Sequence, residues 1–168
     1  MVTDEALMLD IRGGSRDAFE ELFARYRDPL YRFFARRIPL DGRAEDLTQE
    51  TFLAVLKGAR RYEPRGSVRS YLFGIAFNLL SAERRKKEGV GVEIAGREPP
   101  SSSAPDECLW LRHALQKLDP EEREILMLRE YEQLSYAEIA AMLRLPVNTV
   151  RSRLFRSRMA LKGLLQEV

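Results

Sequence analysis

Residues 134–165 read LSYAEIAAMLRLPVNTVRSRLFRSRMALKGLL, and this stretch predicts two helices joined by a tight turn. Ser135 and Glu138 form a capping box at the start of the first helix, in which each side chain bonds the other residue's backbone N–H. Pro146 cannot continue that helix and disfavours a helical residue before it, so the turn falls at residues 144–146. Apolar residues at near-helical spacing give the second helix an inward stripe, made of Val147, Val150, Leu154, Leu161 and Leu164.

The other faces of this second helix are polar and cationic. Five arginines stand between residues 144 and 158 with no acidic residue among them, and Phe155 lies one turn beyond Arg151 on the outward side. A DNA major groove suits such a surface, because arginine binds phosphates and guanine edges while the ring meets a thymine methyl group. We interpret the stretch as a helix-turn-helix whose second helix reads DNA. The alternative is a solvated basic helix whose Phe155 packs on a neighbouring helix.

Composition places the chain among soluble, helix-rich proteins of one domain or two small ones. Of its 168 residues, 45% are hydrophobic and 32% are charged. No apolar run approaches the roughly 20 residues of a membrane span, and the acidic start does not resemble a signal peptide. We therefore expect a cytoplasmic protein without membrane insertion. Cys108 and His113 are the single cysteine and the single histidine, so we expect no internal disulfide, no metal site and no cofactor.

The net charge of +2 is divided unevenly along the chain. Residues 1–87 hold 17 basic and 13 acidic side chains, residues 88–108 hold one and five, and residues 109–168 hold ten and eight. Glycine, proline and a serine run exclude a regular element between residues 88 and 106. We predict an all-α protein with two small helical domains, residues 1–87 and 107–168, joined by a flexible acidic linker, residues 88–106.

In the first domain, the spacing predicts helices over residues 3–11, from Ser15 to about Ile38, and over residues 44–62. The third of these should turn Phe52, Val55, Leu56 and Ala59 inward. Its opposite face carries Asp46, Gln49, Glu50, Leu53 and Lys57. This mixture of acid, amide and leucine suits docking on a partner helix, and a plain solvated face is the alternative.

A long helix over residues 67–87 is apolar nearly all round, which predicts a central position in the first domain. It follows a loop at residues 63–67. Around this loop lie Tyr62, Arg69, Tyr71 and Phe73. Aromatic rings beside cations suit the stacking of unpaired bases. The alternative is that these rings at helical spacing are core residues.

Two separated stretches together resemble a bacterial RNA polymerase sigma factor of the extracytoplasmic-function, or group 4, family. The segments EDLTQETF (45–52) and SVRSYLFGIAFNLLSAERRK (67–86) are similar to region 2 of that family. The segment LDPEEREILMLREYEQLSYAEIAAMLRLPVNTVRSRLFRSRMALKGL (118–164) is similar to region 4. The order, the spacing and the total length of the stretches match as well.

The resemblance implies a protein that binds core RNA polymerase and directs it to promoter DNA, without being an enzyme. The positions that match region 2 docking on the clamp helices of the largest polymerase subunit are Asp46, Leu47, Gln49, Glu50 and Leu53. The positions that match capture of melted minus-10 bases are Tyr62, Arg69, Tyr71, Phe73 and Asn78. Those that match minus-35 reading by region 4 are Asn148, Arg151, Ser152, Phe155 and Arg156. Relatives commonly carry tryptophan where this chain has Tyr71, which leaves open whether Tyr71 meets DNA or only packs.

The resemblance also implies that the linker threads toward the polymerase active site, and that a cognate anti-sigma factor is a possible further partner. Two other classes of function compete with the sigma-factor interpretation. One is a helix-turn-helix regulator that binds DNA independently of polymerase, which leaves residues 44–87 without a purpose. The other is a sigma-like decoy that binds protein partners without promoter DNA.

Overall fold

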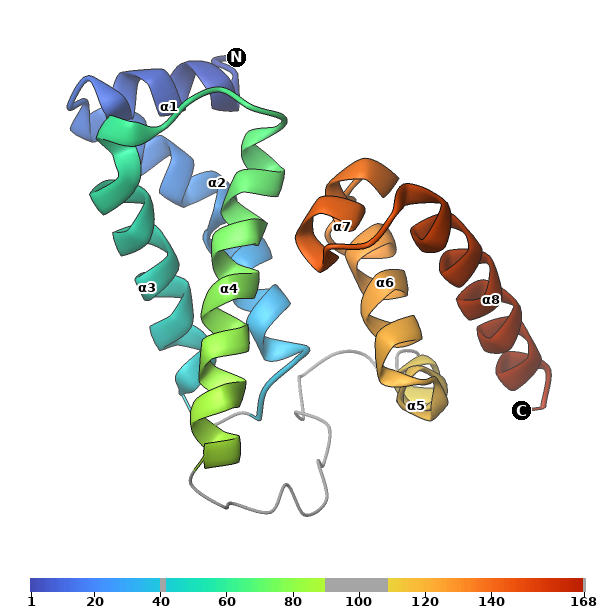
Figure 1. The fold of residues 1–168 in the computed structure, drawn as a ribbon. Coiled ribbons are helices and arrows are strands. Elements are labelled where there is room, and N and C mark those ends of the chain that lie inside the picture. The colour runs from blue at the N-terminus through green and yellow to red at the C-terminus, as the bar shows by residue number, and fades with distance from the viewer. Residues whose placement is uncertain (40–41, 90–108, 168) are drawn as a thin grey trace. The chain divides into compact units, whose positions relative to one another are not determined.

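The structure, a computed structural model, describes residues 1–39, 42–89 and 109–167. The chain divides into two compact units, Met1–Pro100 and Ser101–Val168, and every regular element in the described residues is a helix (Figure 1). The predicted all-α fold with two helical domains is confirmed. The linker predicted for residues 88–106 falls almost entirely outside the described residues. None of the described helices combines the length and the apolar character that a membrane span requires.

The first unit is a bundle of four α-helices and one short 3-10 turn. These elements are α1 (Asp4–Arg12), α2 (Arg16–Ala35), α3 (Arg43–Gly58), η1 (Ala59–Arg61) and α4 (Val68–Gly89). Helix α2 packs against α1, α3 and α4, and α3 also packs against α4. The largest fully buried side chains of this unit come from α1, α2, α3 and α4 and form its core: Met8, Leu22, Leu30, Phe33, Phe34, Leu47, Leu72, Phe73 and Leu80.

Local sequence signals set most helix ends of the first unit. The Ser15 hydroxyl accepts a hydrogen bond from the Ala18 N–H and caps α2. Helix α2 ends at Ala35, three residues before the predicted Ile38, and in the turn that follows the N–H groups of Arg37 and Ile38 both donate to the Phe34 carbonyl. Helix α4 packs against α2 and α3 but is buried mainly on one side. Ile75, Phe77 and Leu79 are half-buried, so the central position predicted from its apolar residues holds only in part.

The second unit contains α5 (Leu109–Lys117), α6 (Pro120–Glu130), α7 (Tyr136–Leu143) and α8 (Val147–Gln166). The predicted capping box is present, since the Ser135 Oγ accepts from the Glu138 N–H and the Glu138 Oε1 accepts from the Ser135 N–H. Arg144 ends α7 in the left-handed conformation with φ of 57°, and α8 begins directly after Pro146. The predicted helix-turn-helix is therefore confirmed at its predicted turn.

The inward stripe predicted for α8 is correct at its centre and wrong at its start. Val150 and Leu154 are fully buried, and Leu161 and Leu164 are half-buried. Val147 is exposed, because it is the first residue of α8 and lies one turn before the first covered position. Ser157 is buried in this stripe, where its single hydroxyl proton is shared between the carbonyl oxygens of Arg153, at 2.7 Å, and Glu122, at 3.1 Å. A serine can occupy this core position because both hydrogen bonds satisfy its hydroxyl.

Candidate functional site

The outward face of α8 presents the side chains that the sequence singles out for DNA reading. Phe155 is 66% exposed, so the alternative in which its ring packs on a neighbouring helix is wrong. Arg151 Nη1 donates to Asn148 Oδ1 at 3.2 Å, and the Ser152 hydroxyl donates to the Thr149 carbonyl oxygen at 3.1 Å. These bonds lie along one helix and leave the remaining donors of Arg151 facing solvent.

Ion pairs divide the arginines of α8 into two groups. Arg153 Nη1 lies 2.8 Å from Glu121 Oε2, and Arg158 Nη2 lies 2.7 Å from Glu130 Oε1, so both reach across to α6. The hydrogen bond that Arg158 donates to Glu130 raises the pKa of Arg158. Arg156 is exposed and makes no side-chain ion pair or hydrogen bond with any described residue. Arg151 and Arg156 thus lie before and after Phe155 on α8, and neither forms an ion pair within the described residues.

The outer face of α3 carries four of the five residues predicted to dock on a protein partner. Asp46, Gln49 and Leu53 are exposed, and Glu50 is half-buried. Leu56 was predicted to point inward but is 46% exposed, because it lies one helical step outside the buried row. That row consists of Ala44, Leu47, Thr48, Thr51, Phe52 and Val55. The structure therefore adds Leu56 to this exposed face of α3.

Leu47, the fifth predicted docking residue, does not belong to the exposed face. Its side chain is 1% exposed and lies in the core of the first unit. The reason is its register, since Leu47 lies one turn before the buried Thr51 and two turns before the buried Val55. Leu47 therefore supports α3 from within and is excluded from the contact surface.

Arg43 connects the acidic residues of α3 to α4. Its guanidinium makes two hydrogen bonds to Glu83, at 2.8 and 2.9 Å, and lies 3.3 Å from Glu50 Oε1 and 3.5 Å from Asp46 Oδ2. Hydrogen bonding from Arg43 lowers the pKa of Glu83 and, in return, raises the pKa of Arg43. A cation at the N-terminus of a helix opposes the helix dipole, and these three carboxylates offset that cost.

Four of the residues predicted to capture single-stranded bases lie around η1 and the start of α4, and Asn78 lies further along α4; the five differ in burial. Tyr62 and Phe73 are buried, at 5% and 1% exposure, so the prediction that their side chains form a contact surface does not fit the structure. Both rings belong to the core beneath this surface, where burial removes their apolar area from water. Tyr71 and Arg69 are half-buried, and Asn78 is exposed.

Ring contacts hold this cluster in place. The Tyr62 and Tyr71 rings meet edge to face with centroids 5.0 Å apart, and the Arg69 guanidinium carbon lies 5.1 Å from the Phe73 ring centroid. Burial raises the pKa of Tyr71. Gly74 lies between Tyr71 and Asn78 on the same side of α4, and a Cβ atom added there would meet nothing within 4 Å. Sequence reasoning missed Gly74, although its spacing of three from Tyr71 and four from Asn78 is the signal that places it on this face.

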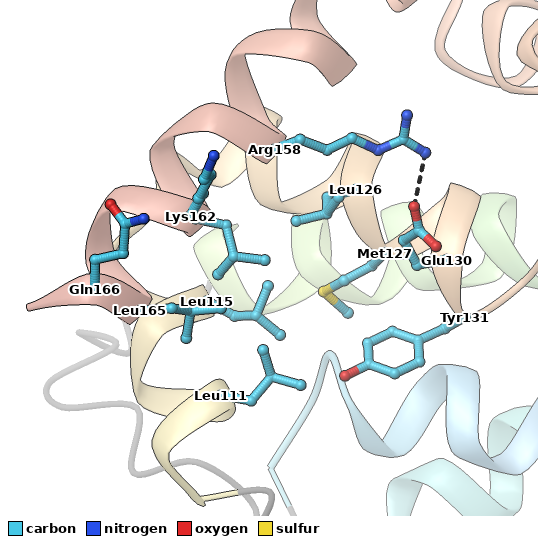
Figure 2. A pocket seen from close by; sticks show the side chains of 11 residues that line it. Leu111, Leu115, Leu126, Met127, Glu130, Tyr131, Arg158, Lys162, Leu165 and Gln166 are labelled. Carbon is cyan, nitrogen blue, oxygen red and sulfur yellow. Dashed lines mark hydrogen bonds and ion pairs between the residues drawn. The ribbon is translucent and has the colours of Figure 1, made fainter. Parts of the chain in front are cut away.

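The second unit also has an apolar hollow of about 440 Å³ between α5, α6 and α8 (Figure 2). Its lining is mostly aliphatic, and the Arg158–Glu130 ion pair lies at its edge (Figure 2). The apolar side chains that line it are Leu111, Leu115, Leu126, Met127, Leu161 and Leu165. Within the described ranges, no group of three or more His, Cys, Asp or Glu side chains is arranged to hold a metal ion.

Comparison with known proteins identifies the two units. Residues 22–89 match the family model described as Sigma-70 region 2, and residues 108–161 match the one described as Sigma-70, region 4. RNA polymerase sigma factor CarQ of Myxococcus xanthus is 37% identical over 165 residues, which cover 94% of each chain. ECF RNA polymerase sigma factor SigE of Mycolicibacterium smegmatis is 33% identical over 88% of this chain and 62% of its own.

A solved structure gives the same relationship in three dimensions. The sigma factor RpoE from Bartonella quintana, in complex with the anti-sigma factor NepR, aligns with a TM-score of 0.69 and 26% identity over 88% of this chain and 96% of that chain. Both matched regions occur in the expected order, and the relatives are ECF sigma factors. The chain therefore belongs to the ECF family of RNA polymerase sigma factors, which act in promoter-specific initiation of transcription.

Proposed function

We propose that this chain binds core RNA polymerase, reads a minus-35 element with α8, and captures melted minus-10 bases at the start of α4. One observation carries the proposal: Phe155 stands exposed between Arg151 and Arg156 on the second helix of a helix-turn-helix. In this proposal, residues 1–87 bind polymerase and the minus-10 element, residues 107–168 bind the minus-35 element, and residues 88–106 connect the two domains. The protein acts in the cytoplasm and contributes binding energy rather than catalysis.

For the minus-35 element, the chemistry of α8 fits a duplex. Arg151 and Arg156 can each donate two hydrogen bonds to a guanine edge, and the Phe155 ring can contact a thymine methyl group. Asn148 and Ser152 lie on the same exposed face and extend it toward phosphates and neighbouring bases. Arg153 and Arg158 hold α8 to α6 and do not read DNA in this proposal, because each is already paired with a glutamate of α6.

For the minus-10 element, the half-buried and exposed part of the cluster supplies the contacts. Tyr71 offers a ring edge and face for stacking, Arg69 offers donors, and Asn78 offers an amide that can pair with a base edge. Gly74 leaves the surface between Tyr71 and Asn78 open for a flipped base or the strand backbone. We assign Tyr62 and Phe73 to support of this surface from the core side.

For polymerase, the exposed face of α3 is the docking surface that we propose. Leu53 and Leu56 are 52% and 46% exposed, and Asp46, Gln49 and Glu50 add polar groups to the same face in the preceding turns. An apolar centre with a polar rim is the usual make-up of a protein interface. The resemblance to region 2 directs this surface to the clamp helices of the largest polymerase subunit.

An anti-sigma factor is the further partner that we propose for this chain. The RpoE relative was solved with an anti-sigma factor bound. In this chain, the apolar hollow lined by α5, α6 and α8 offers such a protein a surface on which to bury an apolar helix (Figure 2).

In vitro transcription tests the proposed function. The purified chain is mixed with bacterial core polymerase and a pool of genomic promoter fragments, and transcript starts are mapped. The expected result is a set of defined starts that share two upstream elements and are absent with core polymerase alone. Tight duplex binding by the chain alone without defined starts would favour a polymerase-independent regulator. Core binding without DNA selection would favour a decoy.

A further inference from the structure

Helix α3 begins with a residue that is not among the docking residues proposed above. Arg43 is the first residue of α3, and Asp46 and Glu50 follow it at helical spacing, which places the three side chains on one side of the helix. Leu53, an exposed leucine of the proposed docking face, follows one turn after Glu50 on the same side. Arg43 therefore starts the row of side chains that the proposed function directs to polymerase.

The Arg43 guanidinium bonds carboxylates on two sides. Its Nε and Nη2 donate to the two oxygens of the buried Glu83, at 2.8 and 2.9 Å. Glu83 comes from α4, which lies beside α3 and ends where α3 begins (Figure 1). Toward the docking face, Nη2 lies 3.3 Å from Glu50 Oε1 and Nη1 lies 3.5 Å from Asp46 Oδ2. The guanidinium thus links a buried anchor to two carboxylates that are 43% and 61% exposed.

Each of the two exposed carboxylates gives Arg43 one oxygen. The other oxygens, Oε2 of Glu50 and Oδ1 of Asp46, accept no hydrogen bond within the described residues. Both oxygens of a carboxylate can accept, so each group can bind a donor of a partner while Arg43 still holds it. A side chain that is oriented in advance loses less rotamer freedom when an interface forms, and this raises affinity.

The charges of this cluster suit a cationic partner. Arg43 brings one positive charge and the carboxylates around it bring three negative ones, so the cluster is acidic overall. The two hydrogen bonds to Glu83 matter here, because they neutralise Arg43 and so reduce its repulsion of an incoming cation. An arginine or lysine of a partner helix is the side chain that fits the remaining oxygens.

We propose that Arg43 is a positioning residue for docking on core RNA polymerase, because it holds the carboxylates of Asp46 and Glu50 in place for a basic side chain of the polymerase. This inference rests on the proposed function. Arg43 acts through the two carboxylates, and Glu83 fixes Arg43 from the core side. The alternative is that Arg43 only fastens α3 to α4, in which case its loss lowers stability and leaves docking unchanged.

The test measures the affinity of the full chain for core polymerase by competition with a labelled sigma factor. Arg43→Met keeps an unbranched side chain but removes the charge and the donors. It should weaken binding about three- to tenfold, because polymerase must then order both carboxylates itself. The salt concentration is about 0.15 M, where screening limits the added long-range attraction of a more acidic face. Circular dichroism confirms that each variant is folded at the temperature used.

Arg25→Met is the matched control. Arg25 is buried to a similar degree and pairs with Asp4 and Glu21, which belong to α1 and α2 and not to the docking face. Its loss should lower the free energy of unfolding while core affinity stays normal. An equal loss of core affinity in Arg25→Met and Arg43→Met would overturn the inference, because general destabilisation would then explain both.

Combination with Asp46→Asn and Glu50→Gln separates positioning from support. If Arg43 acts through these carboxylates, Arg43→Met should cause no further loss of core affinity in their double variant. Losses that multiply, unchanged affinity of Arg43→Met, or tighter binding by it would each overturn the inference. Normal core affinity of the double variant would contradict the docking assignment and, with it, this inference, while leaving promoter-specific initiation intact. Failure of the unaltered chain to start transcription would contradict the proposed function itself.

Discussion

The two regions proposed to bind DNA present their side chains in opposite ways. On α8, Phe155 is 66% exposed and Arg156 makes no bond within the described part of the chain. Around the start of α4, Phe73 is 1% exposed, Tyr71 is half-buried, and Arg69 is held by its neighbours. One surface is open before DNA arrives, whereas the other is largely built into the core of its unit.

The difference follows from what each surface has to recognise. A duplex offers base edges in a groove, so its reader needs long polar side chains that water solvates well before binding. Unstacked bases need flat apolar surfaces, and such surfaces are costly to leave in water when no base covers them. A protein that must remain folded without DNA therefore keeps most of the aromatic area of such a site packed, and supports the exposed part from behind.

The largest expected effect separates the two phenylalanines. Phe73→Ala should destabilise the first unit by about 3–5 kcal/mol, because it leaves a cavity in the core. Phe155→Ala should change stability by less than about 0.5 kcal/mol, because its ring is already in water, yet it should weaken transcription from promoters with an intact minus-35 element. Thermal unfolding followed by circular dichroism measures the first effect, and in vitro transcription the second. Equal destabilisation by both changes would remove the contrast between the two surfaces.

The next effect concerns the arginines of α8. Arg151→Ala and Arg156→Ala should each weaken binding to a promoter with the matching minus-35 element by about 1–3 kcal/mol, if each makes a bidentate base contact. Arg153→Ala is the matched control, since its charge is paired with Glu121, and it should leave discrimination between promoters unchanged. Affinities of holoenzyme for matching and scrambled minus-35 elements give the comparison. Equal losses of affinity on the matching and the scrambled element would show that Arg151 and Arg156 contact phosphates and not base edges.

Sequence patterns predicted most of the fold because its signals are local. The capping box at Ser135 and Glu138, the cap at Ser15 and the turn before Pro146 act within a few residues, so spacing and residue type suffice to predict them. Leu56 and Val147 were placed inward because they are apolar. Their exposure depends on how far the neighbouring helices extend, which no local pattern contains.

The candidate site was less predictable because burial depends on packing between helices. The family resemblance assigned Leu47 to a contact surface and favoured base stacking over core burial for Tyr62 and Phe73, and all three are buried. For Leu47, helical spacing alone indicates the core, since Thr51 and Val55 follow it on the same face. The pairing of Arg153 and Arg158 with α6 joins residues 28 or more positions apart, so sequence spacing cannot reveal which arginines of α8 remain available.

A smaller effect is expected on the docking face of α3. Replacement of both Leu53 and Leu56 by alanine should weaken binding to core polymerase by about 1–2 kcal/mol, because each loses part of the apolar area that an interface would bury. Leu9→Ala, on an exposed leucine of α1, is the matched control and should bind core polymerase normally. Competition with a labelled sigma factor measures the affinities. Unchanged binding by the double variant would remove these leucines from the docking face.

The smallest effect concerns the pH dependence of stability and the Arg43–Glu83 pair that joins α3 to α4. Hydrogen bonding from Arg43 lowers the pKa of Glu83 below its ordinary value of 4.5, with Lys87 and Lys86 adding to the fall and burial opposing it. The folded protein thus releases this proton more readily than the unfolded chain, so the pair stabilises the fold above pH 4.5 and is lost as pH falls below it.

Glu83→Gln should therefore lower the free energy of unfolding by about 1 kcal/mol at neutral pH and flatten its decline in acid. Glu63→Gln is the matched control, because Glu63 pairs with Arg65 at an exposed site where water screens the charges. Urea unfolding over a range of acid and neutral pH gives the two profiles. Arg43 also pairs with Asp46 and Glu50 on the docking face, so in the Glu83→Gln variant its charge acts mainly on those two carboxylates. A change in core affinity alongside the stability loss would show that the pair also sets the charge of the docking face. A flattened profile with unchanged affinity would confine its effect to the fold.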